Sequence, residues 1–344
     1  MRNLLIIFIV LPSIMFSQNG ALAEAFKNGD FHKVIELSNN EILRNPDDFE
    51  THLIIAKSYN EVADFKQAAI FLKQCERLMK LDWEKSWTLV ESIKTNFGIG
   101  NIEEAKQNFV DAKKVKGTKN SEKALREIAL LIGFDELYDN WKIKVTENII
   151  FHFDNSISDA EVKKIVTTRQ KAFNEINRLF KSTLPKKIDF FVWNQKENYN
   201  TYLESSLGFT RPNLCVSHNR INQTPGHELA HNISFWKNRE NVRTKFINEG
   251  IGVCFDQQKN DKFEIAKAAY EKHPMNLIDV WKKQTDLNNE ILYPISGAFV
   301  EYLFNYDKAK FFALVENQTY QNAEIIYGSQ LVNLINEFIL KLNE

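Results

Sequence analysis

The pair Asp30-Phe31 recurs 34 residues later as Asp64-Phe65, and more loosely as Asn101-Ile102. The sequence between about residues 20 and 118 has a helical pattern. Short breaks in this pattern fall at 28–31, 45–48, 62–65 and 98–105. A period of about 34 residues is typical of stacked helix–turn–helix units, each of which buries its apolar face only against its neighbours. The recurrence therefore predicts that the first part of the chain is an array of paired helices.

The second of these units has the clearest internal pattern. Ala56, Tyr59 and Ala68 place small, aromatic and small side chains where two antiparallel helices must approach closely. The second-helix part of the pattern is repeated at Ala105, Phe109 and Ala112. With these residues the segment 19–120 resembles the tetratricopeptide repeat, although Val34 replaces a small residue in the first unit.

The resemblance to tetratricopeptide repeats implies a curved helical surface that contacts other proteins or peptides. Such an array can also serve only to support a neighbouring domain, and the sequence leaves both roles open. The next segment, 121–142, has apolar residues at helical spacing. It is predicted to form one amphipathic helix that caps the array and connects it to the rest of the chain.

The pattern changes after Trp141, and residues 143–344 are predicted to form a second domain. Runs of β-branched and aromatic residues predict strands at 148–154, 187–193 and 213–218. Ser158 and Glu161 form a capping box at the start of a long amphipathic helix that ends near Phe180. The whole chain is therefore predicted to have an α+β fold that is mostly helical, with a small sheet.

A candidate metal site lies where the sequence runs TPGHELAHNISF from Thr224. Thr224 and Pro225 are predicted to cap and begin a helix. Residues four positions apart on a helix have Cβ atoms roughly 5–6 Å apart, so His227 and His231 can direct ring nitrogens at one ion. Glu228 is rotated by about 100° from His227, which places it where a general base takes a proton from water.

A catalytic zinc site needs a third protein ligand and an open position for water. Glu249 is the best downstream candidate, because it lies in an apolar helical pattern over 242–258. The polar residues 238–242 predict a reversal that brings this helix back over the motif helix. No fourth His, Cys or Asp is placed to close the shell, which favours catalysis. The alternative is a chance motif on a helix whose histidines are ordinary surface or core residues.

HELAH followed by NEGIG at 248–252 resembles the glutamate-type zinc metallopeptidases, the gluzincins. Within them it is most similar to the peptidase MA-like domains, which are often fused to tetratricopeptide repeats. The resemblance covers roughly residues 141–344. It implies a zincin-type domain that binds one Zn²⁺ per chain through His227, His231 and Glu249. It also implies that Glu228 is the general base in the hydrolysis of peptide bonds.

Further residues are candidates for supporting roles. Tyr293, placed just ahead of a late helix, is a candidate oxyanion donor, and an ordinary buried tyrosine is the alternative. His218, at the end of the third strand, is a second candidate, although a surface position is favoured for it. Gluzincins of the thermolysin type have an acid four residues after the glutamate ligand, where this chain has Val253. Asp256 could orient a histidine instead, and a solvated acid at the helix end is the favoured alternative.

The formal net charge of −1 leaves no excess of basic residues to attract nucleic acid. The apolar run from Leu4 to Phe16 is too short to span a membrane, so residues 1–17 are predicted to be a secretory signal. An uncleaved membrane anchor is the alternative. Cys75, Cys215 and Cys254 are predicted to be buried free thiols, with a Cys215–Cys254 bridge as the alternative. Those are the chain's three cysteines.

These patterns predict an exported zinc peptidase, periplasmic or extracellular, with no stable membrane span after signal cleavage. Its expected partners are a peptide or protein substrate and a protein bound by the repeats. The third strand is expected to offer an edge to which an extended peptide hydrogen-bonds. The alternative from another class is a non-catalytic interaction protein with a structural or vestigial zinc site. Glu228 argues against it, because a purely structural site has no use for that carboxylate.

Overall fold

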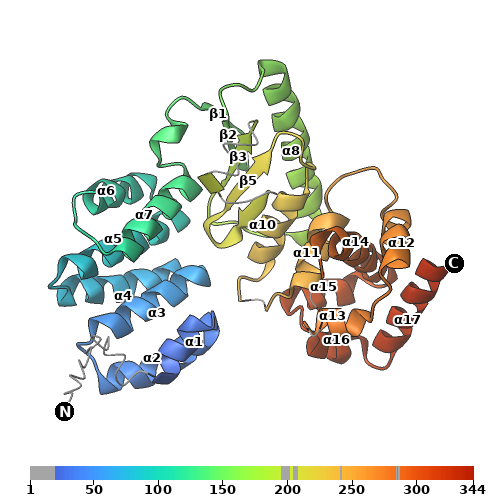
Figure 1. Cartoon of the computed structure of the whole chain (residues 1–344), viewed down its shortest axis with the longest axis horizontal. Coiled ribbons are helices and arrows are strands. Elements are labelled where there is room, and N and C mark those ends of the chain that lie inside the picture. The colour runs from blue at the N-terminus through green and yellow to red at the C-terminus, as the bar shows by residue number, and fades with distance from the viewer. Residues whose placement is uncertain (1–19, 195–201, 204–207, 241, 284, 286) are drawn as a thin grey trace, which may run out of the picture.

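The computed structural model describes residues 20–194, 202–203, 208–240, 242–283, 285 and 287–344. Within these residues the fold is α+β and mostly helical, with one small mixed sheet, as predicted at that level (Figure 1). The predicted signal, 1–17, lies outside the described residues. No helix in the described part of the chain combines the length and the apolar character that crossing a membrane requires.

The first part of the chain is a stack of helices that pack in chain order and lead toward the sheet (Figure 1). They are α1 (Gly20–Lys27), α2 (Phe31–Arg44), α3 (Phe49–Glu61), α4 (Phe65–Leu78), α5 (Asp82–Gly98), α6 (Ile102–Ala112) and α7 (Lys119–Ile132). The recurring aspartates cap the second helix of a pair: Asp30 accepts a hydrogen bond from the Lys33 amide and Asp64 from the Gln67 amide. The four predicted breaks each fall at a boundary between two of these helices, although the last, 98–105, is too long, because α6 already begins at Ile102.

The break between α4 and α5 has no glycine, proline or asparagine and was not predicted. There the Glu84 carboxylate accepts a hydrogen bond from the Leu81 amide at 2.9 Å, which caps α5 from within.

The prediction of a single helix over 121–142 is wrong. Helix α7 ends at Ile132, and its C-cap Gly133 adopts the left-handed φ of +80°; an added Cβ there would lie 2.8 Å from the Phe191 ring. A short 3-10 helix, η1 (Glu136–Tyr138), follows.

The sheet has the strand order β1-β2-β3-β5-β4. Its strands are β1 (Lys142–Val145), β2 (Ile149–Phe153), β3 (Ile188–Trp193), β4 (Phe209–Arg211) and β5 (Val216–Arg220). Strands β2, β3 and β5 are parallel, and the two outer strands run antiparallel to their neighbours. The three predicted strands are confirmed, although the third begins at Val216, after the 3-10 helix η2 (Pro212–Leu214). Consequently β5 is internal, and the prediction that the third strand forms an edge is wrong.

Opposite faces of the sheet pack against different halves of the molecule, because side chains alternate along a strand. Phe190 and Val192 of β3 share a core with α8 (Asp159–Phe180) and α10 (His227–Lys237). Helix α8 starts at the predicted Ser158 cap. Phe191 and Trp193 point the other way, into a core formed with α4 to α7. The helical stack therefore supports the sheet directly.

The rest of the chain is helical and packs beyond α8 and α10 (Figure 1). Its helices are α11 (Lys245–Cys254), α12 (Lys262–Lys272), α13 (Leu277–Trp281), α14 (Asn289–Tyr306), α15 (Lys308–Glu316), α16 (Tyr320–Tyr327) and α17 (Gln330–Asn343). Helices α11 and α14 interlock at two glycines. A Cβ on Gly250 would lie 2.6 Å from the Ser296 carbonyl oxygen, and one on Gly297 would lie 2.3 Å from Val253. This close contact fixes α11 against α14 beside the candidate site.

The three cysteines are free, as predicted. Cys75 and Cys215 are buried, but Cys254 is only half-buried, which corrects the expectation that all three are buried. Burial raises the pKa of the Cys215 thiol to about 12.

Candidate metal centre

Helix α10 begins at His227, the first histidine of the motif. The predicted cap at Thr224 is wrong, because the N-cap is Gly226, with no side-chain cap hydrogen bond. The Gly226 amide donates to the carbonyl oxygen of Asp256 at 3.0 Å. A Cβ on Gly226 would lie 2.4 Å from the Phe255 carbonyl oxygen. The C-terminal end of α11 thus occupies the place of a capping side chain and holds the start of α10.

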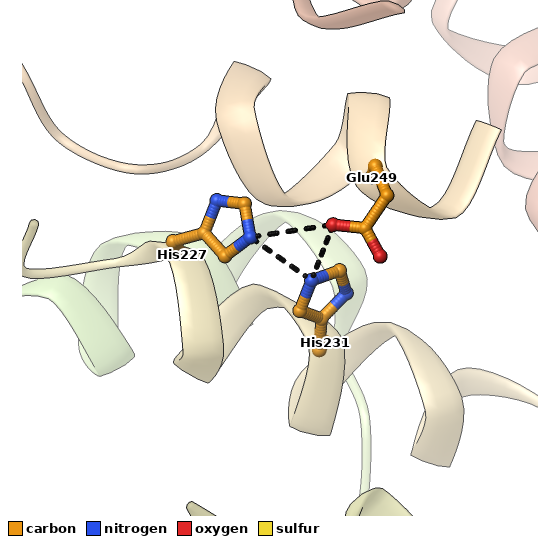
Figure 2. Close-up of side chains that lie close together, drawn as sticks. All are labelled: His227, His231 and Glu249. Atoms are coloured by element: carbon orange, nitrogen blue, oxygen red, sulfur yellow. Dashed lines mark hydrogen bonds and ion pairs between the residues drawn. The ribbon is translucent and has the colours of Figure 1, made fainter. Parts of the chain in front are cut away.

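Three side chains from two helices converge above α10 (Figure 2). The Nε2 atoms of His227 and His231 are 3.2 Å apart. Oε2 of Glu249, on α11, lies 3.6 Å from each of these nitrogens. The predicted helical reversal is therefore present, although α11 is shorter than the predicted 242–258. It brings together the three residues that the sequence selected.

The triangle of donor atoms has the size that a tetrahedral metal ion requires. Donor atoms about 2.0–2.2 Å from an ion at tetrahedral angles are about 3.3–3.5 Å apart. The observed separations of 3.2, 3.6 and 3.6 Å are close to that value. A metal ion can be held by groups of His, Cys, Asp or Glu side chains that lie close together. In the part of the chain that the structure describes, His227, His231 and Glu249 form such a group.

Gly252 keeps the space in front of the two histidines open, a role that the sequence reasoning missed. It lies on α11 one turn after Glu249, on the same helix face. A Cβ at Gly252 would lie 2.9 Å from Nε2 of both His227 and His231. Any larger residue there would therefore displace the donor nitrogens. Its position three residues after the ligand Glu249 on one helix could have indicated this role from the sequence.

The ligands influence each other's protonation. Burial disfavours the charged form of Glu249, but hydrogen bonds to His227 and His231 outweigh burial and hold its pKa well below the usual range. Burial also opposes a charged His227, and the Glu249 carboxylate outweighs this effect and raises the pKa of His227. Glu249 therefore stays ionised, which is the form in which a carboxylate binds a metal ion, and a cation would displace the proton shared with the histidines.

Glu228 is buried, with 4% of its surface exposed, and it faces the sheet edge rather than the bulk solvent. The Thr210 hydroxyl, on β4, donates a hydrogen bond of 2.7 Å to its Oε2. The same hydroxyl lies 3.2 Å from the Glu228 carbonyl oxygen. Thr210 was missed from sequence, because a strand of three residues has no alternating pattern to detect.

No family model matches this chain. No curated protein has significant sequence similarity to it either.

Tyr293 reaches the site from α14. Its ring stacks on that of His227, with centroids 5.8 Å apart. Burial, and then the neighbouring Glu249 carboxylate, raise the pKa of Tyr293, so its hydroxyl keeps its proton. The expectation that it lies ahead of the late helix is wrong, because α14 begins four residues earlier, at Asn289. The tyrosine is therefore held on a rigid element.

His218 is fully buried and lies away from the triangle of ligands, which corrects both expectations for it. Trp193 Nε1 donates to His218 Nδ1 at 3.1 Å, and His218 Nε2 lies 2.9 Å from the Leu131 carbonyl oxygen. Its ring stacks on Phe191, with centroids 4.4 Å apart. Burial lowers the pKa of His218 to about 3. It is a neutral core histidine that joins the sheet to α7.

Asp256 is buried, with 6% of its surface exposed, so the favoured expectation of a solvated acid is wrong. Its carboxylate accepts a hydrogen bond from the Gln258 amide at 2.9 Å and lies 3.7 Å from Lys262 Nζ. Its charge contributes to the raised pKa of His227. Val253, which stands where thermolysin-type gluzincins have an acid, packs against Gly297 in the contact between α11 and α14.

Proposed function

We propose that this chain is a zinc-dependent peptidase. In this proposal residues 143–344 form a gluzincin-type domain and residues 19–120 form tetratricopeptide-like repeats that support it and contact protein partners. The observation that carries the proposal is the triangle of His227, His231 and Glu249 donor atoms, with the buried Glu228 carboxylate on the same helix. One Zn²⁺ held there would polarise a peptide carbonyl and lower the pKa of water.

The protein side chains supply the remaining steps. Glu228 accepts a proton from the attacking water and delivers it to the departing amine, so that the carbon–nitrogen bond breaks as the amine leaves. Thr210 holds this carboxylate in one orientation through its hydrogen bond. The protonated hydroxyl of Tyr293 donates a hydrogen bond to the oxygen that gains charge when the carbonyl is attacked.

The presence of three protein ligands, and not four, favours catalysis over a structural metal. Structural zinc sites have four protein ligands, whereas catalytic sites have three and an open position. Among the described residues no fourth His, Cys, Asp or Glu belongs to the group of His227, His231 and Glu249. A non-catalytic interaction protein would also have no need for a buried, hydrogen-bonded Glu228.

Strand β4 is the proposed place for the substrate backbone. It is the outermost strand next to Glu228, and no described strand pairs with its free edge. An extended peptide can add to such an edge through backbone hydrogen bonds. Because Thr210 of β4 contacts Glu228, a peptide on this edge passes beside the general base.

The test combines metal content with turnover. We expect about one zinc per chain in the purified protein and in Glu228→Gln, and a loss of zinc in His231→Ala. Hydrolysis of an unfolded protein such as casein is expected in the wild type and reduced by at least about a thousand-fold in Glu228→Gln. Equal hydrolysis by wild type and Glu228→Gln would refute the proposal, as would a chain that binds no zinc.

A further inference from the structure

A cavity of about 990 Å³ lies between the helical stack and the edge of the sheet. Its walls come from the turn between α1 and α2, the end of α3, α5, α7, β4, η2, α10 and the residues Arg239 and Arg243 that follow it. Pockets of about 300–1,000 Å³ hold drug-sized ligands, so this volume accommodates several side chains. The role proposed above for the metal centre makes no use of it.

Polar contacts join the two halves of the chain around this cavity. Arg239 pairs with Asp64 at 3.0 Å and donates to the Ala63 carbonyl oxygen at 3.1 Å. Asn213 donates to the carbonyl oxygen of Asn60 at 3.3 Å. The recurring Asp64 therefore caps α4 and also anchors the second half of the chain. These contacts hold the walls of the cavity together.

The charges that line the cavity do not balance. Lys94 is paired with Glu61 at 3.8 Å, and Lys123 with Glu127 at 3.5 Å. Three arginines remain without an ion pair to any residue that the structure describes; they are Arg126 on α7, Arg211 on β4 and Arg243 before α11. The one acid of the lining that is left, Asp30, caps α2. The cavity is thus net positive.

Strand β4 connects this cavity to the metal centre. Thr210 points to Glu228, whereas its neighbours Phe209 and Arg211 line the cavity on the opposite face of the sheet. A peptide strand paired with β4 has the same alternation. Every second side chain of such a peptide is directed to the face where Arg211 and Phe209 lie.

We infer that this cavity binds an acidic segment of a polypeptide, whose Asp or Glu side chains pair with Arg126, Arg211 and Arg243. Carboxylates match the planar guanidinium group, which binds them through two parallel hydrogen bonds. Apolar lining such as Phe209 accommodates the side chains between the acids. The proposed path of the segment along β4 past Glu228 rests on the proposed peptidase function. The proposed preference for acidic residues does not rest on that function.

Fluorescence anisotropy with two labelled peptides tests this inference. One peptide has Glu at alternate positions, and the other has Gln in the same places. Titrations use the full chain with Glu228→Gln, so that the probe stays intact, and are repeated after removal of metal with EDTA. We expect the Glu peptide to bind about ten-fold more tightly than the Gln peptide at low salt, with or without metal.

The double substitution Arg126→Gln/Arg211→Gln should reduce this binding about five-fold or more. Both side chains are exposed, and thermal unfolding checks that the fold is kept. Lys163→Gln/Arg178→Gln on α8 is the matched control, because it removes the same charge from exposed positions outside the cavity lining and should change nothing. Equal binding of the two peptides, or an unchanged affinity in the arginine variant, would overturn the inference. Competition by free glutamate or inorganic phosphate at the same concentration as the peptide would also overturn it, since it would indicate a small-anion site.

These results separate the two proposals. Arginine-dependent binding of the Glu peptide by a chain that hydrolyses nothing would remove the peptidase proposal and keep the acidic-segment site. Zinc-dependent hydrolysis with no preference for the Glu peptide would do the reverse.

Discussion

The Thr210 hydroxyl donates a hydrogen bond of 2.7 Å to the Glu228 carboxylate, which ties the edge strand β4 to the metal-binding helix α10. The two residues are 18 positions apart in sequence and belong to different layers of the fold. This bond gives the proposed general base one orientation. Thr210 therefore acts as a positioning residue for Glu228.

Replacing Thr210 by valine keeps the shape of the side chain and removes the hydroxyl. Because hydrogen bonds to charged groups contribute about 1.5–3 kcal/mol, we expect kcat for casein-derived peptides to fall about ten-fold or more. KM and zinc content should not change, and Thr210→Ser should restore most of kcat. A variant that loses zinc, or in which only KM rises, would show that Thr210 has another role.

Gly252→Ala should impair metal binding without unfolding the chain. The added Cβ would lie 2.9 Å from Nε2 of His227 and of His231, so the donor nitrogens must move out of the triangle. We expect zinc affinity to fall by at least about ten-fold, measured by competition with a chelator, with an unchanged circular dichroism spectrum. Gly20→Ala is the control, because nothing lies within 4 Å of a Cβ there. Full zinc affinity in Gly252→Ala would contradict the geometry of the site.

The metal triangle was predictable because helical spacing alone decides most of it. His227 and His231 lie on one helix face whatever surrounds them, and a polar reversal before an apolar helix brings Glu249 back over them. The helix caps at Asp30 and Asp64 were not predicted, although the recurrence of these residues was noted and each bonds to an amide only three residues away. Each of these features depends on residues of one helix or of two consecutive helices.

The other features that were missed depend on contacts between distant segments. The cap of α10 is the backbone of residues 255–256, which no local pattern at Thr224 can reveal. His218 became a core residue because rings from neighbouring strands enclose it and because Leu131, 87 positions away, accepts its hydrogen bond. Strand β4 is too short for its sequence to differ from a loop.

Tyr293→Phe should reduce turnover with little effect on metal binding. The substitution keeps the aromatic ring that stacks on His227 but removes the proposed donor to the developing oxyanion. Loss of one such donor typically lowers kcat by about a hundred- to a thousand-fold. Tyr302→Phe is the matched control, because it removes a hydroxyl that bonds to Glu337 at 2.8 Å farther along α14, and it should keep full activity. If Tyr293→Phe keeps wild-type kcat, the tyrosine is an ordinary packing residue.

His218 should make the stability of the protein depend on acid pH. Burial lowers its pKa to about 3 in the folded state, whereas an unfolded histidine has a pKa of about 6.5. Between these values the unfolded chain binds more protons, so the stability that the neutral histidine provides is fully present above about 6.5. It is lost by about 1.4 kcal/mol per pH unit as the pH falls toward 3.

We expect urea unfolding of the metal-free chain at pH 7 and pH 5 to show that His218→Gln lowers stability less at pH 5 than at pH 7. Gln cannot be protonated, and all other titrating groups cancel in the comparison of the two proteins. A wild-type advantage that is the same at both pH values would mean that His218 is already protonated, or unburied, in the folded state.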